Sequence, residues 1–176
     1  MALIKLNTKS LPAGSVIQVK HTQVTVRGTQ AIAQNTDTLV SGFTVNITPT
    51  STSSIIQLFA QMVGEFDHGS GGHNNIFYFM RDTTKLAHTG TVTGTQQAGV
   101  CPITQTYGIG SNALTTLEAG MLSFFDTPST VSQITYKLGF RGKQNCTFHI
   151  NGTVQNTGNA AEELGTSFIS AMEIAG

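Results

Sequence analysis

One segment limits the possible folds of this chain more than any other: it runs from Val131 to Arg141 and reads V-S-Q-I-T-Y-K-L-G-F-R. Four large apolar residues lie on one side of this segment when it is extended: Ile134, Tyr136, Leu138 and Phe140. The other side carries Lys137 and Arg141 and must meet water or a partner. Because successive side chains of a strand point to opposite faces, this alternation predicts a strand that covers a core on one side only. Such strands are typical of antiparallel sandwiches and barrels.

Comparable segments recur along the chain, with polar turns rich in Gly, Ser, Thr and Asn between them. They cover residues 15–21, 43–47, 55–63, 76–81, 121–125, 146–150 and 167–174. Only residues 112–119 have a helical character, for one turn at most. A succession of about eight to ten short strands favours an all-β fold, an antiparallel β-sandwich or jelly roll, over a parallel α/β fold.

The spacing of these segments also suggests how they pair. Residues 43–47 and 55–63 are separated by a polar loop and are predicted to form a hairpin, with 55–63 buried on both faces. A second hairpin is predicted to lead through a turn at 142–145 into residues 146–150. The last segment, residues 167–174, is expected inside a sheet, from where it could line the axis of a trimer.

Charged residues make up 10% of the sequence, against about 25% in a typical soluble domain, and the formal net charge is zero. A neutral surface lacks the basic stripe that binds nucleic acid and the polybasic patch that binds membranes, so neither partner is expected. A protein near zero net charge tends to associate, which favours a fixed assembly. The 176 residues suit one domain, predicted as an N-terminal arm over 1–12 and one sandwich over 13–176.

Cysteine usage and the N-terminal residues indicate the compartment. Cys101 and Cys146 are the only cysteines, and no C-x-x-C motif of a zinc or redox site is present. Two free thiols are favoured over a disulfide, although both remain possible. Residues 1–9 contain Lys5 and Lys9 and no apolar stretch of a signal peptide, and no segment approaches the roughly 18 apolar residues of a membrane span. The sequence therefore predicts synthesis in the cytoplasm.

The most unusual loop spans residues 64–75 and reads G-E-F-D-H-G-S-G-G-H-N-N. Glu65, Asp67, His68 and His73 supply the oxygen and imidazole donors that metal ions prefer. Their spacing matches no zinc or calcium motif, and the surrounding glycines indicate mobility. A solvent-exposed loop is therefore favoured, and we predict neither a metal nor a cofactor.

The same loop is a candidate contact for a receptor, because binding residues concentrate on loops that a rigid scaffold holds. Its candidate contact residues are Asp67, His68, His73, Asn74 and Asn75. The strand that follows contains Phe77, Tyr78 and Phe79, which either pack in the core or offer a stacking surface for a sugar or base. Alternation sends Tyr78 to the opposite face from the two phenylalanines, and the core is the favoured place.

No pattern of residues indicates catalysis. The G-x-S-x-G motif of hydrolases is absent, and none of the five histidines has a recognisable catalytic neighbour. The acidic residues are scattered rather than paired as in glycosidases. Gly108 and Gly110 lack the strand–turn–helix context of a phosphate-binding loop. We therefore predict a protein that is not an enzyme.

Several segments carry a resemblance over nearly the whole chain. They are S-L-P-A-G-S-V-I-Q-V (10–19), V-N-I-T-P-T-S-T-S-S (45–54), F-D-T-P (125–128) with T-Y-K-L-G-F-R (135–141), and A-M-E-I-A-G (171–176). In these segments the chain resembles virion structural proteins of bacteriophages, especially of marine phages that infect cyanobacteria and other ocean bacteria. The alternating strands are also, more weakly, similar to trimeric C1q/TNF-like jelly rolls.

The resemblance implies a non-enzymatic virion protein, a trimeric surface appendage of the tail-fibre or head-fibre type that is made in the host cytoplasm. Its expected partners are its own copies and other virion proteins. The arm at residues 1–12 is the candidate virion anchor, with Lys5, Lys9 and Leu11 as contacts. Two alternatives remain open: a tail-fibre module that binds a glycan receptor on the host, and a capsid decoration (cement) protein.

Overall fold

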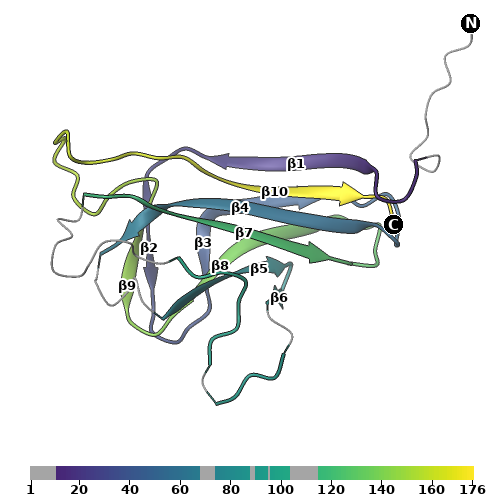
Figure 1. Ribbon diagram of the computed structural model, residues 1–176, viewed down its shortest axis with the longest axis horizontal. Helices are drawn as coiled ribbons and strands as arrows, with labels where there is room; N and C mark the ends of the chain where they lie inside the picture. Colours follow the sequence, from purple (N-terminus) through teal and green to yellow (C-terminus); the bar gives the residue numbers. More distant parts are fainter. Residues whose placement is uncertain (1–10, 68–73, 88–89, 95, 104–114) are drawn as a thin grey trace, which may run out of the picture.

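The computed structural model describes residues 11–67, 74–87, 90–94, 96–103 and 115–176. These residues form ten strands in two antiparallel sheets and, within the described ranges, no helix. Figure 1 shows β1, β10, β4 and β7 side by side in one layer. The predicted all-β antiparallel sandwich is confirmed.

The two sheets differ in size. Sheet A has six strands: β1 (Val16–Val24), β2 (Gly28–Ile32), β4 (Ile55–Phe66), β7 (Glu118–Asp126), β9 (Cys146–Ile150) and β10 (Ser167–Ile174). Sheet B has four strands: β3 (Thr38–Ile47), β5 (Asn75–Arg81), β6 (Thr84–Leu86) and β8 (Ile134–Gly142). Sheet B is ordered β3-β8-β5-β6, and sheet A follows the order β1-β10-β4-β9-β2 with β7 on the other side of β4.

The longest strand, β4, changes its neighbour partway along one edge. It pairs with β10 up to Gln61 and with β9 from Gly64 onward, while β7 runs along the opposite edge. At the change, the Val63 N–H donates to the Ser167 hydroxyl over 2.9 Å, and the Asn151 N–H donates to the Val63 carbonyl over 2.8 Å. The Ser167 hydroxyl and the Asn151 N–H thus take the place of a neighbouring strand, and both backbone polar groups of Val63 remain hydrogen-bonded.

The core lies between the inner faces of the two sheets. All four apolar residues of the alternating 134–140 segment are buried there, as predicted. Four phenylalanine rings form its centre, with centroids 4.6 to 5.9 Å apart: Phe66, Phe77, Phe140 and Phe148. Offset and edge-on contacts of this kind stabilise a core beyond simple area burial. The sandwich is therefore held by aromatic packing contributed by both sheets.

Both predicted hairpins are wrong, because each connection crosses from one sheet to the other. β3 belongs to sheet B and β4 to sheet A, and the same holds for β8 and β9. The loop at residues 48–54 can cross because the carboxylate of Glu173 accepts hydrogen bonds from the Thr50 N–H (2.6 Å) and the Ser54 hydroxyl (2.6 Å). Crossing also lets each strand turn its apolar side toward the other across the core.

Two further expectations need correction. β4 is not buried on both faces over residues 55–63; half-buried Gln57, Phe59 and Gln61 alternate with fully buried neighbours. The outer face of sheet A is therefore partly open to solvent along residues 57–61, whereas farther along β4 the Val154 N–H donates to Glu65, which is buried on the same face. Residues 112–114 of the helical stretch lie outside the described residues, and the described part contains no helix, since β7 begins at Glu118.

The strand β10 lies between β1 and β4, as predicted for the last segment. Its Glu173 is fully buried and also accepts a bond of 2.6 Å from the Gln18 side chain. Burial raises the pKa of Glu173, but the hydrogen bonds from Ser54, Gln18 and Thr50 outweigh burial and lower the pKa below its usual value. The ionised carboxylate therefore ties β1, β10 and the crossing loop together.

Candidate functional site

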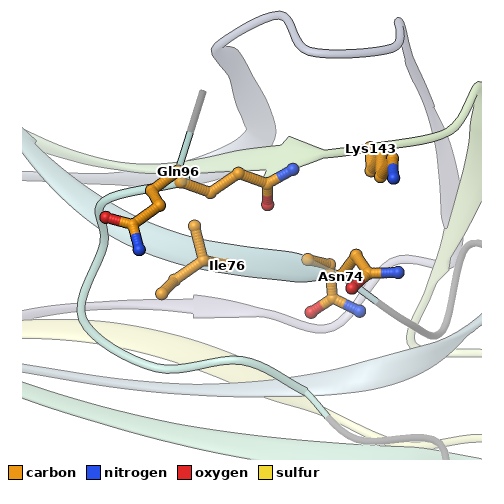
Figure 2. A pocket seen from close by; sticks show the side chains of 6 residues that line it. Asn74, Ile76, Gln96 and Lys143 are labelled. Atoms are coloured by element: carbon orange, nitrogen blue, oxygen red, sulfur yellow. The ribbon is translucent and has the colours of Figure 1, made fainter. Parts of the chain in front are cut away.

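A cavity of about 320 Å³ lies at the start of β5, where the chain arrives from the unusual 64–75 loop (Figure 2). Its lining residues come from three segments: Asn74, Asn75, Ile76, Gln96, Gln97 and Lys143. The side chains are carboxamides apart from one ammonium group and one apolar group. Among these lining residues there is no carboxylate, and Lys143 is the only one with a charged side chain.

Backbone geometry fixes the entry to β5 at this cavity. Asn74 adopts a left-handed conformation (φ 52°), which asparagine tolerates better than most residues. Its carbonyl accepts a hydrogen bond of 3.1 Å from the Lys143 N–H, so the turn between β8 and β9 is tied to the start of β5. Asn75 is buried, and its side-chain oxygen accepts a bond of 3.1 Å from the Ile103 N–H. Asn74 is exposed and available to a ligand, whereas Asn75 mainly shapes the wall.

The third wall is the segment at residues 96–103, which runs along β5. The Val100 N–H donates to the Phe77 carbonyl over 2.7 Å, and the Phe77 N–H donates to the Cys101 carbonyl over 2.8 Å. A Cβ at Gly99 would overlap Ile76, so only glycine allows this close approach. The Thr93 N–H donates to the Gln96 side-chain oxygen over 3.0 Å, and Gln96 lies beside the cavity.

The chemistry of this cavity suits a ligand rich in hydroxyl groups. Carboxamides donate and accept hydrogen bonds, and the Lys143 ammonium donates to hydroxyl or carboxylate oxygens. Figure 2 shows the half-buried Ile76 side chain between Asn74 and Gln96, where it offers a small apolar surface. A sugar presents the same combination of hydroxyl groups and an apolar face. An acidic sugar would in addition match the ammonium group.

The structure brings together only part of the predicted receptor-contact loop. Asn74 and Asn75 line the cavity, while His68 and His73 lie outside the described residues. Asp67 is occupied elsewhere: its carboxylate accepts a bond of 2.7 Å from the Thr147 N–H. Asp67 borders a different cavity, of about 520 Å³, beside β2 and β9.

Sequence reasoning missed Gln96, Gln97 and Lys143. They come from loops that carry no motif, and only the tertiary contacts of these loops bring them to β5. In the sequence, Lys143 is identified only as part of the G-K-Q-N turn at residues 142–145, and this turn is predicted to close a hairpin. No pattern in residues 96–97 could have identified them.

The two described members of the candidate metal cluster, Glu65 and Asp67, both accept hydrogen bonds from the backbone. Glu65 is fully buried, and its carboxylate accepts a bond of 2.7 Å from the Val154 N–H. Within the described ranges, no three histidine, cysteine, aspartate or glutamate residues gather closely enough to hold a metal ion. Of the candidate anchor residues, Lys5 and Lys9 lie outside the described part, and Leu11 borders a cavity of about 260 Å³ near Gly176.

The two thiols and the aromatic strand are also placed. Cys101 and Cys146 are free thiols, and burial, with a smaller contribution from Asp67, raises the pKa of Cys146 to about 11. Phe77 and Phe79 belong to the core. Tyr78 is buried on the opposite side of sheet B, with the Lys85 Nζ atom 4.0 Å from its ring centre. None of these three rings is exposed for stacking.

The outer face of sheet A, called face A below, carries no formal charge on its central rows. Strand registers place three rows across it: Val19-Met172-Gln57-Phe125, His21-Ser170-Phe59-Ser123 and Gln23-Phe168-Gln61-Met121. All these side chains are at least partly exposed, and Met121 and Phe125 are each 59% exposed. The rings of Phe59 and Phe168 contact each other at 5.6 Å on this face.

The outer face of sheet B, called face B below, is charged. Asp37 forms ion pairs there with Lys85 at 2.9 Å and with Arg141 at 3.4 Å. Lys137 lies on the same face of β8 as Arg141. Face B thus carries Asp37, Lys85, Lys137 and Arg141, whereas the central rows of face A carry no formal charge.

No protein-family model matches this chain, and neither does any curated protein. Within the described residues, no helix is long and apolar enough to cross a membrane. The arrangement of faces and cavities is therefore the basis for any inference about function.

Proposed function

We propose that the protein is a non-enzymatic structural component of a bacteriophage particle, displayed on the virion surface as a homo-oligomer, with a trimer as the expected state. The observation that carries this proposal is face A, a broad exposed surface with several large apolar side chains and no formal charge on its central rows. Six of the twelve side chains in its three rows are apolar, and large exposed apolar side chains that gather on one face mark interaction sites.

The distribution of charge supports an assembly with a fixed orientation. Face B carries Asp37, Lys85 and Arg141 as mutual ion pairs, which suits contact with water. Interface cores contain few charged residues. In an assembly, the uncharged face A would therefore be buried and the charged face B would face water. Because the sequence resembles phage virion proteins, we propose that this assembly is part of a phage particle.

The test is whether the protein is part of intact particles. Peptides of this chain should be measured by mass spectrometry in phage particles purified on a density gradient, in a fixed ratio to the major capsid protein. Deleting residues 1–12 should abolish incorporation and leave the far-ultraviolet circular dichroism spectrum unchanged. Absence from purified particles would contradict the proposal; labelled antibody on the head rather than the tail would favour the capsid decoration alternative.

A second candidate function is glycan binding at the cavity beside β5, and the carboxamide lining of that cavity favours it. A host-surface glycan, above all an acidic one, would be the ligand. Replacing Lys143 by alanine should weaken binding to such a glycan about tenfold, or by about 1.4 kcal/mol, as measured by titration calorimetry. Lys20→Ala, an exposed lysine on β1, is the matched control and should leave affinity unchanged.

A further inference from the structure

Sheet A ends in two long strands whose free edges differ. β1 has a register shift between Val16 and Gln18 and carries Lys20 in its middle. A bulge and an exposed lysine are two devices by which proteins prevent an edge strand from pairing with another chain. The β1 edge is therefore protected.

The edge of β7 has neither device. Its nine residues pair with β4 without any shift, from Gly64 opposite Glu118 to Ile56 opposite Asp126. Between these two buried acids, the residues A-G-M-L-S-F-F contain no charge and no proline. Among the described residues, β4 is the only strand that pairs with β7. On its other edge, no described strand pairs with β7, and the backbone groups between Ala119 and Phe125 lie in a regular row without a charged side chain.

The end of this edge is held rigidly. The Arg81 guanidinium lies 2.9 Å from the Asp126 carboxylate, and the Tyr136 hydroxyl donates to the same carboxylate over 2.7 Å. Arg81 and Tyr136 belong to sheet B, so these contacts fasten β7 across the sandwich. An edge strand that is fixed at one end can pair at a lower ordering cost.

The side chains beside this edge extend the uncharged surface. Met121 and Phe125 are the most exposed large apolar side chains in the strands of sheet A, and they lie at the ends of the outer two of the three rows of face A. Edge and face therefore form one continuous surface without a formal charge, on which backbone groups and apolar side chains lie next to each other.

We propose that a second copy of this chain binds at this surface, which comprises the open edge of β7 and the adjoining part of face A. A partner must bring an uncharged, partly apolar surface, because any charge would lose its water without meeting an opposite charge. An identical copy brings such a surface at equal concentration. The inference rests on the proposed homo-oligomeric role, for which it names the contact.

The experiment compares three lysine substitutions in the full chain by light scattering coupled to size exclusion, over a wide range of concentrations. The wild type should have the mass of an oligomer. Met121→Lys and Phe125→Lys should each reduce the mass to that of one chain, because both place a charge in the contact. Leu39→Lys makes the same change on face B, where Leu39 is 41% exposed, and should retain the oligomer.

Folding and contact are separated by a second measurement. All three variants should keep the wild-type circular dichroism spectrum, since each replaced side chain is largely exposed. Backbone amides of residues 119–125 should lose hydrogen-exchange protection in the Phe125→Lys monomer relative to the wild-type oligomer. A wild type that is a single chain at all concentrations, or an oligomer that both β7 variants leave intact, would overturn the inference. Neither result bears on the presence of the protein in purified particles, which tests the proposed function separately.

Discussion

The two outer faces of this sandwich are built on different principles. On face B, charged groups contact one another: Asp37 pairs with Lys85 and Arg141, and Lys85 also lies over the ring of Tyr78, whose buried hydroxyl has no hydrogen-bond partner among the described residues. On face A, the side chains of the central rows carry no formal charge, and the large apolar ones are exposed (Val19, Met121, Phe125) or half-buried (Phe59, Phe168, Met172). A face that carries ion pairs suits contact with water. The comparison therefore points to face A, rather than face B, as the side on which we expect a partner to bind.

The largest effect is expected when the carboxylate of Glu173, which links the strands beneath face A, is replaced. Glu173→Gln replaces an acceptor of four hydrogen bonds with an amide that also carries donors, so buried donors would face each other. We expect a loss of about 3 kcal/mol in the free energy of unfolding, measured by urea denaturation. Glu162→Gln, at an exposed loop where the carboxylate accepts from Thr157, is the control and should cost far less. Equal losses would contradict the assigned role of Glu173.

The same carboxylate predicts a dependence on pH. The pKa of Glu173 is lower in the folded protein than its usual value, so the folded state favours the ionised form. Its stabilising contribution is fully present above the pKa of an unfolded glutamate, about 4.3, and is lost as the pH falls through the lower folded pKa. The melting temperature of Glu173→Gln should therefore converge with that of the wild type in this acidic range. A constant difference between the two proteins would count against this linkage.

A smaller effect is expected where face B packs over a glycine. A Cβ at Gly139 would overlap the Tyr78 ring, which lies across β8. We expect Gly139→Ala to cost about 2 kcal/mol through overpacking, as measured by thermal unfolding. The double change with Tyr78→Leu should recover part of this loss, because it frees the space. Purely additive losses would show that the ring does not cause the strain.

The smallest effects concern the surface charges, and here the two faces should respond to salt in opposite ways. Asp37→Asn breaks two partly exposed ion pairs and should cost less than about 1 kcal/mol, an amount that shrinks further in sodium chloride. Association through face A should instead strengthen in sodium sulfate, which favours burial of apolar surface. Light scattering at rising sulfate concentration gives the measurement. Dissociation in sulfate would show that charge, rather than apolar contact, holds the copies together.

The sequence predicted the strands better than their partners. The period-2 pattern of residues 134–140 correctly gave both the strand and its buried side, because one-sided burial imposes that pattern directly. The same pattern says nothing about which sheet a strand joins. A polar loop such as 48–54 can close a hairpin or cross the core, and Glu173, which decides the matter, lies far away in sequence.

The candidate site was predictable only where the chain itself is unusual. Asn74 and Asn75 were identified because they end a glycine-rich loop in front of a clear strand. Lys143 and Gln96 reach the cavity through tertiary contacts, the former by its bond to the Asn74 carbonyl. Face A was equally hidden, because it appears only after strand registers align residues from four separate segments.

The position of β10 has a consequence for how the chain folds. β10 separates β1 from β4, and the contact between Gln18 and Glu173 joins residues 155 positions apart. Sheet A therefore cannot form completely until β1 and β10 meet, and the entropy cost of closing this long loop comes before the contacts that offset it. We expect refolding to be slow for a domain of this size. Until it is complete, β1 and β4 keep open edges, and the concentration of newly made chains decides whether they fold or aggregate.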